Sequence, residues 1–145
     1  MLYDSLRIEP HELDSVYDKY KESIIIGVAP SYYLKRNEGA CRVVMIYRKH
    51  RKYLIDECSG LNSSHRCALK GLILAAEQIK IPKPIVIVSA APFGFKKALK
   101  GRGVNSDMWN LFFDILKEKE CPSITEIVVQ NASRKIEALC KEPLK

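Results

Sequence analysis

Two clusters of basic residues contain the side chains in this sequence best suited to bind a ligand. The denser cluster is Arg48-Lys49-His50-Arg51-Lys52, which lies between Tyr47 and Tyr53, and the second contains Lys96, Lys97, Lys100 and Arg102. Lysine and arginine attract phosphates and release the counterions that condense on nucleic acid. The formal net charge of +7 also favours polyanionic partners. Each cluster can equally be interpreted as a solvated turn or helix face.

The residues that usually catalyse reactions or hold metals form no familiar pattern. His11, His50 and His65 are far apart in sequence, and Gly101-Arg102-Gly103 lacks the strand before it and the helix after it that a nucleotide-binding motif needs. The five cysteines include no C-x-x-C pair. We therefore expect reduced, mostly buried thiols and neither a structural metal nor a cofactor.

The sequence also predicts where the protein acts. No apolar run approaches the roughly 20 residues that span a bilayer. The first ten residues lack the basic and then apolar layout of a signal peptide. We therefore expect a protein that acts inside a cell, in the cytoplasm or nucleus, with no membrane partner.

The hydrophobic pattern predicts the elements that position the candidate side chains. A short amphipathic helix is expected over residues 10–21, and β-branched runs predict three antiparallel meander strands at 23–28, 42–47 and 52–57. After Gly60 the apolar period becomes helical, with Ser63 or Ser64 as the N-cap. The other predicted elements are a buried parallel strand at 85–88, helices at 93–99, after Asn105 and at 133–140, and a strand at 124–129.

This order of elements resembles the ribonuclease H fold, and five short motifs extend the resemblance. The family motif Asp-Gly-Ser is matched by Ala29-Pro30-Ser31, and Asn-Asn-Arg-Met-Glu-Leu is matched by Ser64-His65-Arg66-Cys67-Ala68-Leu69. Thr-Asp-Ser is matched by Ser89-Ala90-Ala91, and Asn-x-Asp-Leu-Trp is matched by Asn105-Ser106-Asp107-Met108-Trp109. The last motif, Asn-Glu-x-Ala-Asp-x-Leu-Ala, is matched by Ser133-Arg134-Lys135-Ile136-Glu137-Ala138-Leu139-Cys140. We therefore expect an α/β fold, with a ribonuclease H-like mixed five-stranded sheet and helices on both faces, over residues 23–145. Residues 1–22 are expected to form an N-terminal extension that contains the short amphipathic helix.

The motifs depart from the family where its chemistry takes place. The resemblance implies hydrolysis by two magnesium ions, which need carboxylate ligands. Three of the four family carboxylate positions are Ala29, Ala68 and Ala90 here, and only Glu137 remains. We therefore expect a pseudo-enzyme without catalytic residues or a metal. Because Pro30 and Pro92 also depart from the family motifs, natural divergence is favoured over deliberate inactivation.

The function that follows from these features is noncatalytic binding of nucleic acid, such as RNA or an RNA/DNA hybrid. Candidate binding residues in the first cluster are Arg48, Lys49, Arg51 and Lys52. Those in the second, where the resemblance implies a basic substrate-gripping element, are Lys96, Lys97, Lys100 and Arg102. The resemblance also implies that Ser63, Ser64 and His65 meet the minor groove and its 2′-hydroxyls.

Two alternatives remain open. The first is a structural tether or a protein-interaction or dimerisation domain of viral, retroelement or ribonucleoprotein origin, which would use the N-terminal helix and exposed aromatics such as Tyr32 and Tyr33. The second is an inactivated form of a metal-dependent ribonuclease H. Restoring the carboxylates at positions 29, 68 and 90 would test the second alternative.

Overall fold

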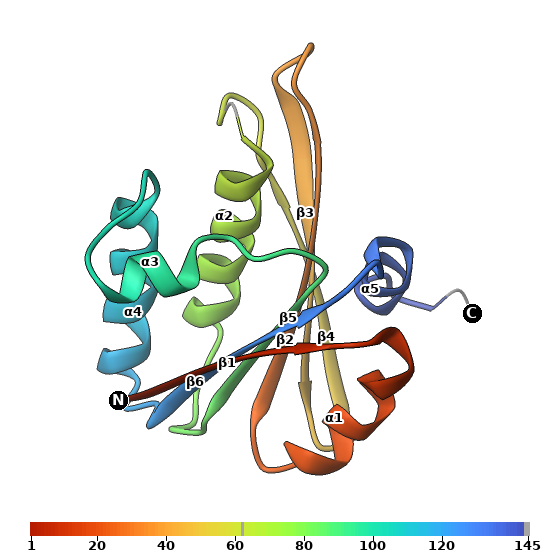
Figure 1. Ribbon diagram of the computed structural model, residues 1–145, viewed down its shortest axis with the longest axis vertical. Helices are drawn as coiled ribbons and strands as arrows, with labels where there is room; N and C mark the ends of the chain where they lie inside the picture. Colours follow the sequence, from red (N-terminus) through yellow and green to blue (C-terminus); the bar gives the residue numbers. More distant parts are fainter. Residues whose placement is uncertain (62, 144–145) are drawn as a thin grey trace.

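Across residues 1–61 and 63–143, which the computed structural model describes, a six-stranded mixed sheet has the order β1-β6-β5-β2-β3-β4 (Figure 1). Strands β1, β6, β5 and β2 run parallel to one another, whereas β3 is antiparallel to both β2 and β4. The strands are β1 (Leu2–Ile8), β2 (Ile24–Tyr33), β3 (Glu38–Tyr47), β4 (His50–Glu57), β5 (Ile85–Ser89) and β6 (Ser123–Val129).

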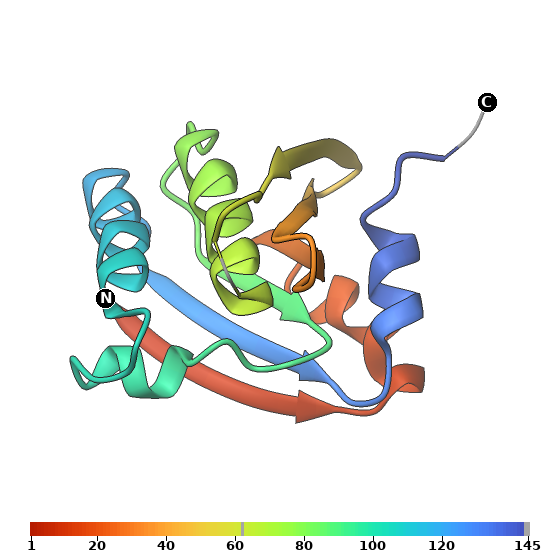
Figure 2. The same cartoon turned by 90° about the horizontal axis from the view of Figure 1, so that it is seen from above.

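Helices cover both faces of this sheet (Figure 2). One apolar core lies between the sheet and helices α2 (Ser64–Glu77), α3 (Phe95–Leu99) and α4 (Ser106–Glu118). The other core lies under α1 (Leu13–Lys19), which follows the short 3-10 turn η1 (Pro10–Glu12), and under α5 (Ser133–Leu139). The predicted α/β architecture is therefore confirmed, and it is broadly consistent with a ribonuclease H-like fold.

Local sequence explains the best-predicted elements. The meander of β2, β3 and β4 forms as expected, and β5 is buried along its whole length between β6 and β2. Helix α2 begins after Ser63, whose hydroxyl oxygen accepts hydrogen bonds from the backbone N–H groups of His65 and Arg66. Ser63 thus satisfies two of the amide groups that a helix start leaves unpaired.

Strand β1 is an element that the sequence analysis did not predict. It pairs in parallel with β6, from Leu2 opposite Ser123 to Ile8 opposite Val129, so the sheet has one strand more than expected in the described chain. Leu6 and Ile8 pack against the core under α1 and α5, whereas Ser5 and Arg7 alternate with them along the strand. This alternation is the signal that would have identified the strand.

The cysteines Cys41, Cys58, Cys67, Cys121 and Cys140 are all buried and free in the described part of the chain. No helix between residues 1 and 143, residue 62 aside, is long and apolar enough to cross a membrane.

Candidate functional site

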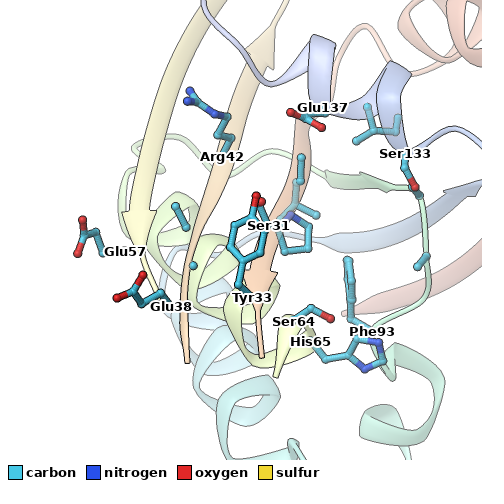
Figure 3. Close-up of a pocket in the computed structure, with 18 of the residues that line it drawn as sticks. Ser31, Tyr33, Glu38, Arg42, Glu57, Ser64, His65, Phe93, Ser133 and Glu137 are labelled. Carbon is cyan, nitrogen blue, oxygen red and sulfur yellow. The ribbon is translucent and has the colours of Figure 1, made fainter. Parts of the chain in front are cut away.

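The larger of two neighbouring pockets lies where β2 and β5 end, beside the first turns of α2 and α5. Ligands of open α/β sheets commonly bind outside the carboxyl ends of the parallel strands. This strand-end pocket has a volume of about 780 Å³. Figure 3 shows Glu38 and Glu57 on one side of it and His65 and Phe93 on another.

Three of the four positions at which the resemblance implies family carboxylates come together in the strand-end pocket. Ala29 and Ala90 line it, and so does Glu137, whose carboxylate forms an ion pair with the Lys141 ammonium at 3.0 Å. Ala68 is different, because it is 0% exposed and belongs to the core under α2. The fourth position therefore does not line the pocket.

These residues do not fit the two-magnesium site that the resemblance implies. The methyl groups of Ala29 and Ala90 offer no ligand oxygen, and Glu137 already faces a lysine. Among the described residues, no group of three or more histidine, cysteine, aspartate or glutamate side chains is placed to hold a metal ion.

The first basic cluster lies away from this pocket. It occupies the turn between β3 and β4 and the first three residues of β4. The register of β3 on β2 places this turn beside the start of β2, whereas the pocket is at the end of β2. Arg48 forms an ion pair with Glu22 at 3.2 Å, and Arg51 stacks over the Tyr17 ring. Lys52 donates a hydrogen bond to the Gln78 side chain at 2.8 Å, so these cations already contact their own fold.

The second basic cluster surrounds a different pocket. Lys96, Lys97 and Arg102 line a cavity of about 470 Å³ between α3 and the paired strands β1 and β6. Arg7 on β1 also lines this α3 pocket, although the sequence analysis did not select it. Lys100 follows α3 and is exposed, but it does not line either pocket.

The two pockets adjoin each other through His65 and Phe93, which line both. Their rings are in edge-to-face contact, with centroids 5.5 Å apart. Ser64 lines the strand-end pocket, whereas Ser63 is used as the helix cap. Of the predicted sites, the structure therefore brings together Ser64, His65, Lys96, Lys97 and Arg102.

No family model and no curated protein matches this chain. Function must therefore be inferred from the chemistry of the two pockets, since one fold can serve many activities.

The α3 pocket contains a buried acid that the sequence analysis missed. Glu126 on β6 is 3% exposed, and its carboxylate accepts a hydrogen bond from the Ser5 hydroxyl at 3.0 Å. Burial raises the pKa of the Glu126 carboxyl, while the Ser5 hydrogen bond and then the charges of Lys96 and Arg7 lower it. The sequence around Glu126 did not mark it as a site residue, because its hydrogen-bond partner Ser5 comes from β1 and reaches it only when β1 pairs with β6.

Glu126→Gln is expected to stabilise the protein at neutral pH. A carboxyl whose pKa is higher in the folded than in the unfolded chain loses stability as pH rises from about 4.3 through the folded pKa. The advantage of the glutamine variant should therefore grow over that interval, by about 1.4 kcal/mol for each unit of difference between the two pKa values, and then level off. Urea unfolding of both proteins between pH 4 and pH 8 measures it, and an advantage independent of pH would contradict the prediction.

Proposed function

We propose that this chain is a noncatalytic nucleic-acid-binding domain that holds RNA or an RNA/DNA hybrid along the edge formed by the two pockets. The observation that supports this most strongly is the set of four basic side chains, Arg7, Lys96, Lys97 and Arg102, around the α3 pocket. They come from β1, α3 and the following loop, so the fold gathers positive charge that is dispersed in the sequence. Such a cluster attracts phosphates through charge and counterion release.

The two pockets suit different parts of a nucleic acid. The strand-end pocket is not predominantly basic, because Glu38, Glu57 and Glu137 line it together with Arg42 and Lys141. Carboxylates repel phosphates but accept hydrogen bonds from 2′-hydroxyls and base amino groups. We therefore place the phosphates at the α3 pocket and the sugar or base edges at the strand-end pocket.

The alanines at positions 29 and 90 favour metal-free binding. Two carboxylates at these positions would add negative charge to a pocket that already contains three glutamates, and a phosphate strand would then need bound cations to approach. With alanine, the hydroxyls of Ser31 and Ser64 can reach a sugar without that repulsion.

Fluorescence anisotropy with labelled RNA/DNA hybrid, duplex and single strands, at two salt concentrations and without metal, tests the proposal. We expect Lys96→Gln/Lys97→Gln/Arg102→Gln to weaken binding roughly tenfold or more and to reduce the salt dependence. Arg48→Gln/Lys49→Gln/Arg51→Gln is the matched control, because it also removes three positive charges from the formal +7, but at β3 and β4, on the opposite edge of the sheet from the α3 pocket. Equal losses in both variants, or no binding by the unchanged protein, would contradict the proposed interface.

A protein-interaction role is the second candidate, and one observation favours it. The hairpin of β2 and β3 projects beyond the helices (Figure 1), and Tyr33 and Leu34 at its tip are 66% and 72% exposed. Tyr32 is half-buried and donates a hydrogen bond to Asn37, while α1 buries Leu13 and Val16 in its own core. Light scattering over a range of concentrations would detect self-association, and Tyr33→Ser/Leu34→Ser should abolish it if the tip is responsible.

A further inference from the structure

The interior of the α3 pocket combines three kinds of chemistry. At its floor is the Glu126 carboxylate, and among the described residues no basic nitrogen lies within 4.0 Å of it. On its wall are Phe93 and Trp109, and around its mouth are basic side chains. A ligand that satisfies all three would have hydrogen-bond donors at one end, a flat apolar body and an anionic group at the other end.

The aromatic wall is held in a fixed orientation. The indole N–H of Trp109 donates a hydrogen bond to the backbone carbonyl of Phe93 at 2.8 Å. The Trp109 ring also packs edge-to-face against Phe95 and is stacked on Phe113, with centroids 5.6 Å away in both contacts. Val104, which is 94% exposed, adds an apolar group at the mouth. Phe93 and Trp109 are 5% and 2% exposed, so only a small part of each ring is open to a planar base, and that part is held rigidly.

The buried acid narrows the range of planar ligands. Hydrophobic burial of a carboxyl is unfavourable unless its oxygens find donors, and the structure gives Glu126 one donor, the Ser5 hydroxyl. Guanine presents two adjacent donors, N1–H and the N2 amino group, which match the two oxygens of a carboxylate. Adenine and cytosine place an acceptor nitrogen beside their single amino donor, and uracil has one N–H between two carbonyls, so each of them would repel one carboxylate oxygen.

We propose that the α3 pocket binds an unpaired guanine nucleotide, with the base edge on Glu126, the ring beside Trp109 and the phosphate on Lys96, Lys97 and Arg102. The volume of about 470 Å³ is within the usual range for small-molecule pockets. This inference rests on the proposed function, because it names the part of the nucleic acid that the basic cluster holds. The same chemistry is available in a free guanine nucleotide and in an unpaired guanine of a strand.

Titration with GMP, AMP, CMP, UMP and guanosine tests the base preference. Trp109 is the only tryptophan of the chain, so its fluorescence reports directly on the pocket, and calorimetry gives the affinities. We expect GMP to bind at least about tenfold more tightly than the other three nucleotides, since only guanine offers two adjacent donors to the carboxylate. GMP should also bind about tenfold more tightly than guanosine, which lacks the phosphate that the basic side chains would hold. Equal affinity for the four nucleotides would overturn the proposal.

Glu126→Gln is the decisive variant, because its carboxamide replaces one acceptor oxygen with a donor. We expect it to lose the preference for GMP over AMP while remaining folded, as the unfolding measurement above verifies independently. Glu118→Gln makes the same chemical change on the exposed surface of α4 and should leave the preference intact. An unchanged preference in Glu126→Gln would overturn the assignment of Glu126.

Single strands that end in one unpaired guanine or adenine distinguish the two sources of the nucleotide. Tighter binding of the guanine-ended strand than of GMP, lost in Glu126→Gln, supports a guanine held within a strand. Binding of GMP without binding of any strand supports the guanine pocket but overturns the proposed strand interface. Salt-dependent strand binding that is indifferent to both the terminal base and Glu126→Gln overturns the guanine pocket and leaves the strand interface in place.

Discussion

Ala68→Glu is expected to destabilise the folded protein by about 3 kcal/mol or more, since it combines overpacking with burial of a carboxyl. Ala68 is 0% exposed and packs in the core under α2, so the longer side chain would have to displace core residues. In contrast, Ala29 and Ala90 are only half-buried and line the strand-end pocket. Ala29→Asp and Ala90→Asp should therefore change the stability by about 1 kcal/mol or less. Urea unfolding of the three single variants provides the comparison.

Combinations of these substitutions also test whether the chain is an inactivated ribonuclease H. If the alanines replaced an intact metal site, Ala29→Asp/Ala68→Glu/Ala90→Asp would fold and cleave an RNA/DNA hybrid when magnesium is added. We expect Ala29→Asp/Ala90→Asp to fold and remain inactive, and the triple variant to be strongly destabilised. Magnesium-dependent cleavage by the triple variant would contradict this expectation and would favour the inactivated-enzyme alternative over natural divergence.

Gly71→Ala is expected to destabilise the protein by about 2 kcal/mol, although alanine is the better helix former by about 1 kcal/mol. At Gly71, helix α2 approaches β3 so closely that a Cβ atom would overlap the Cys41 Sγ atom and lie 3.0 Å from the Val43 Cγ2 atom. Cys41 and Val43 are themselves 0% exposed, so neither side chain has free space to move into. Thermal and urea unfolding of the single variant measure the effect.

Removing the obstructing sulfur provides the control. In a Cys41→Ala background, Gly71→Ala should be clearly less destabilising than in the unchanged protein, because the nearest atom is gone. The difference between the two backgrounds is the coupling energy of a double-mutant cycle. Equal costs in both backgrounds would show that close contact with Cys41 is not the cause.

The sequence predicts the fold better than it predicts the site. The meander strands, the cap at Ser63 and the buried strand β5 depend on local patterns, namely β-branched runs, a helical apolar period and a hydroxyl before it. Strand β1 was missed because Asp4 interrupts its alternation of apolar and polar residues, and because a partner distant in the chain stabilises it. Tertiary pairing of this kind overrides local propensity.

The same difference between local pattern and tertiary pairing explains which candidate binding residues could be predicted from the sequence. Charge density along the chain singles out Arg48–Lys52, but the hairpin carries these residues to the end of the sheet away from the strand-end pocket. Arg7 and Glu126 became candidates only when β1 and β6 placed them beside the second basic cluster. Neither has a basic or acidic neighbour in sequence that would have marked it as part of a site.

The parallel pairing of β1 with β6 has a consequence for the order of folding. The hydrogen bond from Ser5 to Glu126 joins residues 121 positions apart, so a ribosome must synthesise nearly all of the described chain before it can form. Until then β1 has no neighbouring strand, while the local meander of β2, β3 and β4 can already assemble. The floor of the α3 pocket is thus completed by one of the last contacts available to the nascent chain.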